Sequence, residues 1–332
     1  MIRRHIIAMV VLAATLLAAV LLRLGISDSG WQWPGNAALW ELRGIRVVCG
    51  LTVGLGLSTA GVLLQALLRN PLASPDLIGV SSGASLAVVL ALFFVAGGAS
   101  GEGGGGGFAI ATWHSGPAFV GAAAALWLVY GLSQRRGLVD PTSLVLIGLM
   151  LNIMFGAGIL LLQHLAPGRE LASSRYLVGS ITENLSWRLV GASAGVTTAC
   201  VGVAAILGKS IDAAMLGDDE ARSVGVRVGG LRVAMLALAG VLAAIGVTLA
   251  GPIGFVGLIC PHLARLLTGL SGGHRVLVAA AALAGASTVV LGDSLVRAVA
   301  PSSGRLPLGV VMALIGGPVF IAMLRREQRR AT

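Results

Sequence analysis

The chain has 332 residues, of which 56% are hydrophobic and only 11% are charged, and its mean hydropathy is +0.94. Soluble domains carry roughly 25% charged residues, so this composition excludes an ordinary soluble protein and indicates an integral membrane protein. The formal net charge is +10, which raises the question of a nucleic-acid partner.

Long apolar runs predict membrane-spanning helices, because about 20 mostly apolar residues cross the hydrocarbon core. Strand-type alternation is not evident, so we expect an all-α polytopic fold rather than a barrel. The first run is interpreted as a retained helix, since it is longer than the apolar part of a signal peptide. The ten predicted spans are residues 6–24, 46–68, 78–97, 116–133, 142–163, 188–208, 232–250, 254–270, 276–298 and 307–324.

The basic residues predict the orientation of the chain. An even number of spans places both termini on one side of the membrane, and positively charged loops favour the cytoplasm. Fifteen of the 23 lysines and arginines fall on the side of the termini, and the other eight fall on the opposite side. Both termini are therefore expected in the cytoplasm, and the basic excess needs no nucleic-acid partner to explain it.

The turn after the second span carries polar side chains into the third span. Its sequence, RNPLASPDLIGVSSGAS, covers residues 69–85. Prolines stop the second helix, and Asp76 is expected to cap the third. The hydroxyls of Ser81 and Ser82 are candidates for lining a path through the membrane, although serine in a membrane helix commonly bonds back to its own backbone.

Two short motifs suggest chemistry that their context does not support. GVSSG, residues 79–83, satisfies the G-x-S-x-G pattern of hydrolases, but no strand precedes it, so an intramembrane enzyme is disfavoured. GVAAILGKS, residues 202–210, resembles a phosphate-binding loop, but its spacing is one residue too long and it begins inside an apolar span. Neither motif predicts an active site, and no ATP site is expected in this chain.

The connection between spans six and seven is densely charged. It reads LGDDEARSVGVRVGGLR, residues 216–232. We expect two short helices, one starting at Ser210 and ended by Gly217, the other capped by Asp218 and ended by Gly225. Exposed apolar side chains beside mixed charges make this segment a candidate docking surface for a cytoplasmic protein, and a solvated loop is the equal alternative.

Few ionisable residues lie inside the predicted spans. Asp293 and Arg297 are four residues apart in the ninth span, so a local ion pair near the outer end is expected. A proton relay would need a chain of such groups, which counts against a secondary transporter. The three cysteines have no metal-binding spacing, and we expect no metal site.

Four segments together resemble the signature blocks of the FecCD-type ABC importer permeases, a family that includes the vitamin B12, ferric siderophore and haem permeases. The blocks occur in the family's order, and the resemblance covers nearly the whole chain. They are GVLLQALLRNPLASPDLIGVSSGAS (61–85), LGDDEARSVGVRVGGLR (216–232), AGPIGFVGLICPHLARLL (250–267) and LPLGVVMALIGGPVF (306–320).

The resemblance implies one transmembrane permease domain over residues 1–332, with the ten-helix bundle of BtuC-like type II importers. It also implies partners: a second permease subunit in a homodimer or heterodimer, two cytoplasmic ATPase subunits and an extracytoplasmic substrate-binding protein. The chain itself would be no enzyme and would hold no cofactor. It would lie in the bilayer of the bacterial inner membrane with both termini in the cytoplasm.

The resemblance further implies roles for particular residues. Coupling helices within residues 210–227 would contact the ATPase through Asp218, Asp219, Glu220 and Arg222. The binding protein would dock on Arg43, Arg46 and Arg297, although the family's Arg-Leu-Pro-Arg reads RGIR here. Thr142 and Ser143 match the cytoplasmic gate region, and Ser81 and Ser82 belong to the translocation path.

The prediction of the cargo rests on the resemblance to the family. A ferric siderophore is expected because it is the commonest cargo of such permeases, and haem or a corrinoid such as vitamin B12 is the alternative within the family. His164 and Arg175, near the outer mouth, would suit an anionic or haem-like cargo. A secondary transporter is the alternative of another class, but it leaves the charged segment unexplained.

Overall fold

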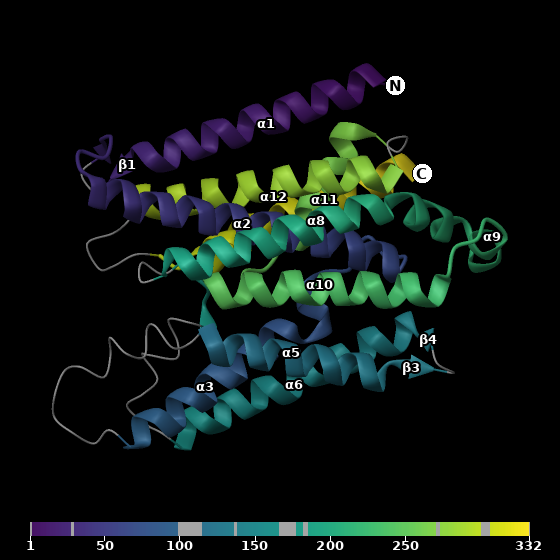
Figure 1. Cartoon of the computed structure of the whole chain (residues 1–332), viewed down its shortest axis with the longest axis horizontal. Helices are drawn as coiled ribbons and strands as arrows, with labels where there is room; N and C mark the ends of the chain where they lie inside the picture. Colours follow the sequence, from purple (N-terminus) through teal and green to yellow (C-terminus); the bar gives the residue numbers. More distant parts are fainter. Residues whose placement is uncertain are drawn as a thin grey trace.

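The protein forms a bundle of helices whose axes run roughly parallel, as the computed structural model shows (Figure 1). The structure describes residues 2–27, 30–98, 115–135, 138–165, 177–181, 185–269, 273–299 and 306–331. The long helices are α1 (Ile2–Gly25), α2 (Ala37–Leu67), α3 (Val80–Gly98), α5 (Ser115–Leu132), α6 (Pro141–Leu165), α8 (Trp187–Leu216), α10 (Val228–Ala250), α11 (Val256–Thr268), α12 (Gly273–Ala298) and α13 (Leu308–Ala331).

Short elements connect these helices. A 3-10 helix, η1 (Pro75–Ile78), precedes α3, and the six-residue helix α9 (Asp218–Ser223) follows α8. Two antiparallel hairpins pair β1 (Ile26–Ser27) with β2 (Gly30–Trp31) and β3 (Gln134–Arg135) with β4 (Leu138–Val139). Figure 1 shows β1 at one end of the bundle, and α9, β3, β4 and both termini at the other. We call these the β1 end and the α9 end.

The all-α membrane fold expected from the sequence is confirmed. Within the described residues, seven helices are long and apolar enough to cross a membrane, and three shorter apolar helices accompany them. Each of the ten predicted spans corresponds to one of these helices. The eighth span is the shortest, the 13-residue α11, which contains Pro261 and begins after the irregular segment 251–255.

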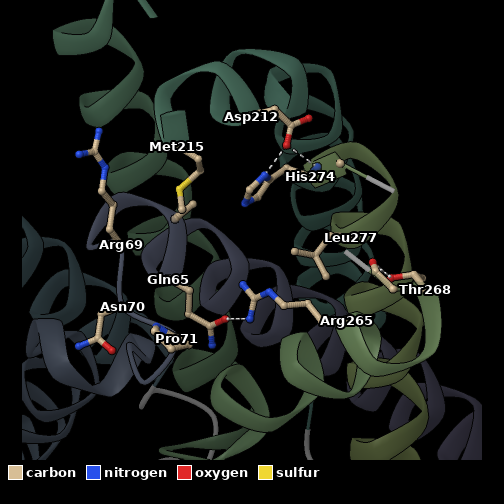
Figure 2. A pocket seen from close by; sticks show the side chains of 13 residues that line it. Gln65, Arg69, Asn70, Pro71, Asp212, Met215, Arg265, Thr268, His274 and Leu277 are labelled. Atoms are coloured by element: carbon tan, nitrogen blue, oxygen red, sulfur yellow. Dashed lines mark hydrogen bonds and ion pairs between the residues drawn. The ribbon is translucent and has the colours of Figure 1, made fainter. Parts of the chain in front are cut away.

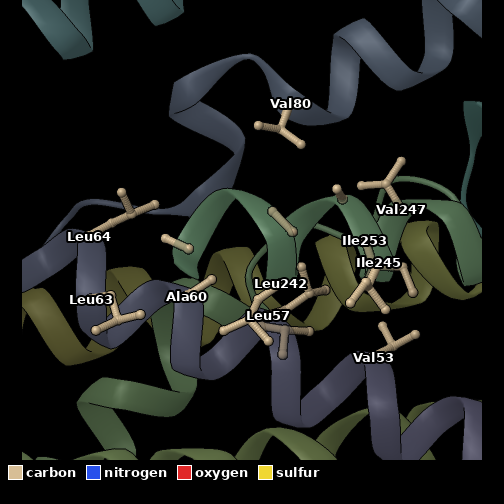
Figure 3. Packing of buried hydrophobic residues seen from close by; sticks show 14 of the residues in the cluster. Val53, Leu57, Ala60, Leu63, Leu64, Val80, Leu242, Ile245, Val247 and Ile253 are labelled. Atoms are coloured by element: carbon tan, nitrogen blue, oxygen red, sulfur yellow. The ribbon is translucent and has the colours of Figure 1, made fainter. Parts of the chain in front are cut away.

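The centre of the bundle is α2, which is buried along most of its length. Helices α8, α10, α11 and α12 pack around it. Figure 3 shows Leu57 and Ala60 of α2 beside Leu242 of α10, with Val80 from the start of α3 nearby. By contrast, only 17–28% of the spanning part of α1, α5, α6 and α8 is buried inside the bundle, as expected of helices that face lipid or another subunit.

Small residues bring the central helices into close backbone contact. A Cβ added at Gly61 of α2 would overlap the carbonyl group of Gly257 in α11, and one at Gly54 would overlap the carbonyl group of Gly285 in α12. Such close approach increases the dispersion contacts between helices. These contacts drive helix association in a membrane, because lipid tails are as apolar as the helix surfaces and the hydrophobic effect contributes little. Small residues therefore allow close backbone contact at these crossings.

Two predictions about where helices begin are wrong in this part of the fold. The segment from Ser210 is not a separate helix, because α8 continues without a break to Leu216 and ends at Gly217 as expected. The Asp76 carboxylate accepts the hydroxyl of Ser81 rather than a backbone N–H at the start of α3, so Asp76 is not the N-cap of that helix. It lies inside η1, whose C-cap is Gly79 with a φ of 76°.

Candidate functional site

The charged segment forms a compact projection at the α9 end (Figure 1). Gly217 separates α8 from α9, and Asp218, Asp219 and Glu220 form the first turn of α9, where acidic side chains favourably meet the helix dipole. Asp218 is thus the first helical residue, not the cap. Gly225, with a φ of 83°, reverses the chain before α10, as the sequence predicted.

Asp218 fixes α9 to two other parts of the bundle. Its Oδ1 pairs with Arg69 Nη2 at 2.8 Å, and its Oδ2 pairs with Arg232 Nη2 at 2.7 Å. Arg69 also donates to the carbonyl of Ala214, and Arg232 donates to that of Val139 in the hairpin. The carboxylate therefore joins the end of α2, the start of α10 and α9. The two arginines were not among the predicted site residues.

The other charged side chains of α9 face solvent. The Asp219 side chain is 92% exposed, against 31% for Asp218, and it pairs with Arg222 one turn later at 3.0 Å. Leu216 is 80% exposed and Val224 is 69% exposed. An apolar residue therefore flanks α9 on each side of its exposed charges, which is the composition of a protein-binding surface.

A pocket of about 280 Å³, with both polar and apolar side chains in its lining, lies near this projection, between the ends of α2, α8, α11 and α12. Figure 2 shows two of its internal contacts between helices. Arg265 donates to Gln65 Oε1 at 2.6 Å, and the Asp212 carboxylate lies 2.6 Å from His274 Nδ1. Asp212 also accepts the backbone N–H of His274 and thereby ties the end of α8 to the first turn of α12.

A buried charge cluster joins three helices toward the β1 end. Arg46 of α2 pairs with Asp293 Oδ1 at 2.7 Å, and Arg23 of α1 donates through Nε to Asp293 Oδ2. Arg297, four residues away on the same helix, was expected to be the partner of Asp293. Both carboxylate oxygens instead receive arginines from other helices. Arg23 was missed because nothing local in its sequence points to a partner 270 residues away.

The predicted docking arginines differ in exposure. Arg43 is buried and donates to the backbone carbonyls of Leu24 and Gln32, the second at 2.6 Å, which holds the β1–β2 connection against α2. Arg46 is buried beside Asp293. Arg297 is half-buried in the last turn of α12. The structure thus brings Arg46 close to Asp293 and gives both Arg43 and Arg46 partners within the chain.

The path serines belong to a polar cluster around η1. Ser81 donates to Asp76 Oδ1 at 3.1 Å, and Ser82 donates to Asn152 Oδ1 at 2.5 Å. Asn152, near the middle of α6, donates in turn to the backbone carbonyl of Asp76 at 2.8 Å. Asn152 was not predicted, because a single polar residue in an apolar helix gives no sign of its partner.

The predicted gate residues lie at the α9 end. Thr142 is exposed and Ser143 is half-buried, both in the first turn of α6. The hydroxyl and the backbone N–H of Ser143 bond to the carboxylate of Asp140, which lowers the pKa of that carboxyl. Asp140 thus caps α6, with Pro141 at the first helical position. His164 is exposed in the last turn of α6, and Arg175 lies outside the described residues.

The remaining sequence motifs carry no site of their own. Residues 202–210 lie wholly within α8, and residues 79–83 begin α3 after a 3-10 turn, so neither adopts the geometry of its motif. In the part of the chain that the structure describes, no three His, Cys, Asp or Glu side chains are grouped as metal ligands.

Comparison with known proteins gives matches along nearly the whole chain. The FecCD transport family matches residues 5–326. The cobalamin import system permease protein BtuC of Halobacterium salinarum is 32% identical, covering 96% of this chain and 80% of that protein. The iron(3+)-hydroxamate import system permease protein FhuG of Bacillus subtilis is 35% identical, covering 87% and 83%. A solved metal-chelate type ABC transporter in an inward-facing conformation is 28% identical with a TM-score of 0.80, covering 97% and 99%.

Proposed function

The chain belongs to the FecCD transport family, and from this premise we propose that it is the membrane-spanning permease subunit of an ATP-driven importer of iron chelates. The observation that carries the proposal is the family match over residues 5–326 together with the exposed, charged helix α9 at the end of the bundle. The permease provides the path, and ATP is hydrolysed by a cytoplasmic partner.

In this proposal α9 and its flanks are the surface that contacts the ATPase subunits. Asp219, Glu220 and Arg222 are exposed and supply the contact, whereas Asp218 holds α9 in position through Arg69 and Arg232. A displacement of α9 is thereby transmitted to α2 and α10. Because α2 is the central helix of the bundle, such a displacement reorients the helices packed around it.

The proposal also covers the outer partner and the gate. A substrate-binding protein docks at the β1 end, where Arg43, Arg46 and Arg297 were predicted to meet it. Since the guanidinium groups of Arg43 and Arg46 are bonded within the chain, we expect them to shape this surface and Arg297 to be the more accessible of the three. Thr142 and Ser143 belong to the gate at the α9 end, which we place in the cytoplasm of a bacterial cell.

Two copies of the permease, or two related ones, complete the membrane part in this proposal. The apolar faces that α5, α6 and α8 expose offer surfaces for lipid and for the second subunit. A ferric siderophore is the proposed cargo, with haem or a corrinoid as the alternative. The iron-hydroxamate and cobalamin permeases among the relatives support both possibilities.

Reconstitution tests the proposal. The permease is co-expressed with candidate ATPase and binding-protein subunits from the same organism, purified, and placed in proteoliposomes. We expect ATP-dependent accumulation of a radiolabelled ferric chelate that requires the loaded binding protein. A panel of ferric siderophores, haem and cobalamin identifies the cargo. Uptake driven by a proton gradient without ATP, or no stable complex with an ATPase, would contradict the proposal.

A further inference from the structure

The carboxylate of Asp76 lies at mid-depth in the membrane bundle. Asp76 in η1 is within hydrogen-bond reach of Asn152, which is near the middle of α6, and the backbone around Gly79 packs against Gly148 and Leu151 of the same helix. Because α6 spans the membrane from one end to the other, its middle marks the centre of the hydrocarbon core.

The carboxylate of Asp76 is only half satisfied. Ser81 donates to Oδ1, but among the residues that the structure describes none donates to Oδ2, and no basic side chain pairs with it. Asp76 is half-buried, and Oδ2 is not one of the enclosed polar atoms. An ionisable group at this depth is costly against lipid, so its open side must face water, a polar cavity or a polar solute.

Two irregular stretches of backbone meet at this carboxylate. One is the loop through η1 to Gly79, and the other is the segment 251–255 between α10 and the short helix α11. A Cβ added at Gly254 would lie 3.9 Å from Asp76 Oδ2, so the two stretches are adjacent. Phe255 adopts a left-handed φ of 68°, a conformation that a bulky residue keeps only where the surroundings impose it.

Irregular backbone at membrane depth occurs where protein buries it or where it lines a water-filled cavity. In transporters, short or interrupted helices that meet at the midplane mark the site where the solute is bound. We propose that Asp76 lies in the translocation path, contacts the cargo there, and disfavours anionic cargo relative to neutral cargo. This inference rests on the proposed function and adds the charge class of the cargo to it.

Cysteine accessibility tests the position of Asp76. The three native cysteines are replaced by alanine, and Asp76→Cys is compared with Val203→Cys, which lies at mid-helix on the exposed apolar face of α8. Both variants, in proteoliposomes with the ATPase, are treated with a cationic, water-soluble methanethiosulfonate. We expect modification of Cys at 76, slowed by the loaded binding protein and ATP, and none at 203. Protection of position 76 from the reagent in every nucleotide state would overturn the inference.

Transport selectivity tests the charge effect. Uptake of a neutral ferric trihydroxamate and of an anionic ferric tris-catecholate is measured for the wild type, Asp76→Asn and Asp76→Glu. Each chelate is presented at saturating concentration with the same binding protein, so that its affinity for the binding protein does not affect the comparison between variants. Removal of one charge in a poorly solvated site is expected to raise the anionic-to-neutral ratio by about tenfold in Asp76→Asn. Asp76→Glu keeps the charge and should keep the wild-type ratio.

The outcomes distinguish a failure of the proposed function from a failure of the role assigned to Asp76. If the wild type accumulates no chelate with ATP, the proposed function fails. If the wild type transports but Asp76→Asn leaves the ratio unchanged, or Asp76→Glu shifts it equally, only the assignment of Asp76 fails. A purely structural role would lower uptake of both chelates together and would leave their ratio at the wild-type value.

Discussion

Asp218 differs from its neighbour Asp219 in what it contacts, although the two stand side by side in the sequence. The first carboxylate joins Arg69 and Arg232, whereas the second pairs with Arg222 on the solvent side of α9. Surface ion pairs contribute about 0–1 kcal/mol each, so the pairs of Asp218 matter more for the position of α9 than for the stability of the bundle.

Replacing these two residues separately distinguishes positioning from contact. Asp218→Asn is expected to lower the Tm of the isolated permease by about 2–4 °C, since it loses the pairs to Arg69 and Arg232. Asp219→Asn, the matched control, should leave the Tm unchanged. Both should lower the ATPase stimulation that the loaded binding protein produces. Equal Tm values for the two variants would show that Asp218 does not anchor α9.

The partners of Asp293 could not be predicted from its local sequence. A carboxylate four residues before an arginine on one helix predicts a local pair, and nothing in the local pattern points to α1 or α2. The structure places Arg23 and Arg46 against it, from segments 270 and 247 residues away in the chain. Such partners depend on which helices are adjacent, and hydropathy and helical periodicity contain no information about that.

At the scale of elements, packing between the central helices depends on glycine at particular crossings. Gly61→Ala in α2 would drive a methyl group into the backbone of Gly257, so we expect destabilisation of about 1–3 kcal/mol from overpacking, with lower yield after heating. Gly195→Ala on the exposed face of α8 is the control, because no atom lies within 4 Å of its added Cβ. Alanine is a better helix former there by about 1 kcal/mol.

Thermal unfolding of the purified complex, followed by size-exclusion chromatography, compares the two variants. Gly195→Ala should match or exceed the wild type, while Gly61→Ala should unfold at a lower temperature. If Gly61→Ala is as stable as Gly195→Ala, the α2–α11 contact is looser than the structure indicates.

The sequence predicted the elements better than their ends. All ten apolar runs became helices because length and apolar content are enough to identify a span. The ends of helices that continue into polar segments were predicted less well. Helix α8 continues past Ser210 to Leu216 and ends only at Gly217. The 3-10 helix η1 begins at Pro75 and is ended by the left-handed Gly79, two signals that are visible in the sequence. The position of η1 at the middle of the bundle depends on its packing against α6, and the local sequence does not predict that contact.

At the scale of the whole molecule, the two ends of the bundle differ in charge. The α9 end carries Arg4, Arg69, Arg135, Arg222, Arg227, Arg232, Arg265 and Arg275, and the β1 end carries Arg23, Arg43, Arg46, Arg188 and Arg297. Three arginines of the β1 end are buried, two of them beside Asp293. Because basic loops are retained in the cytoplasm, the α9 end is expected there, together with both termini.

Labelling of intact cells tests this orientation. In the background without native cysteines, Gly35→Cys marks the β1 end and Ser223→Cys marks α9; Gly35 has no atom within 4 Å of an added Cβ, and Ser223 is exposed. A membrane-impermeant maleimide should label position 35 once the outer barrier is opened, and position 223 only after the inner membrane is permeabilised. The reverse pattern would place α9 outside, beyond reach of an ATPase, and would exclude the coupling role proposed for it.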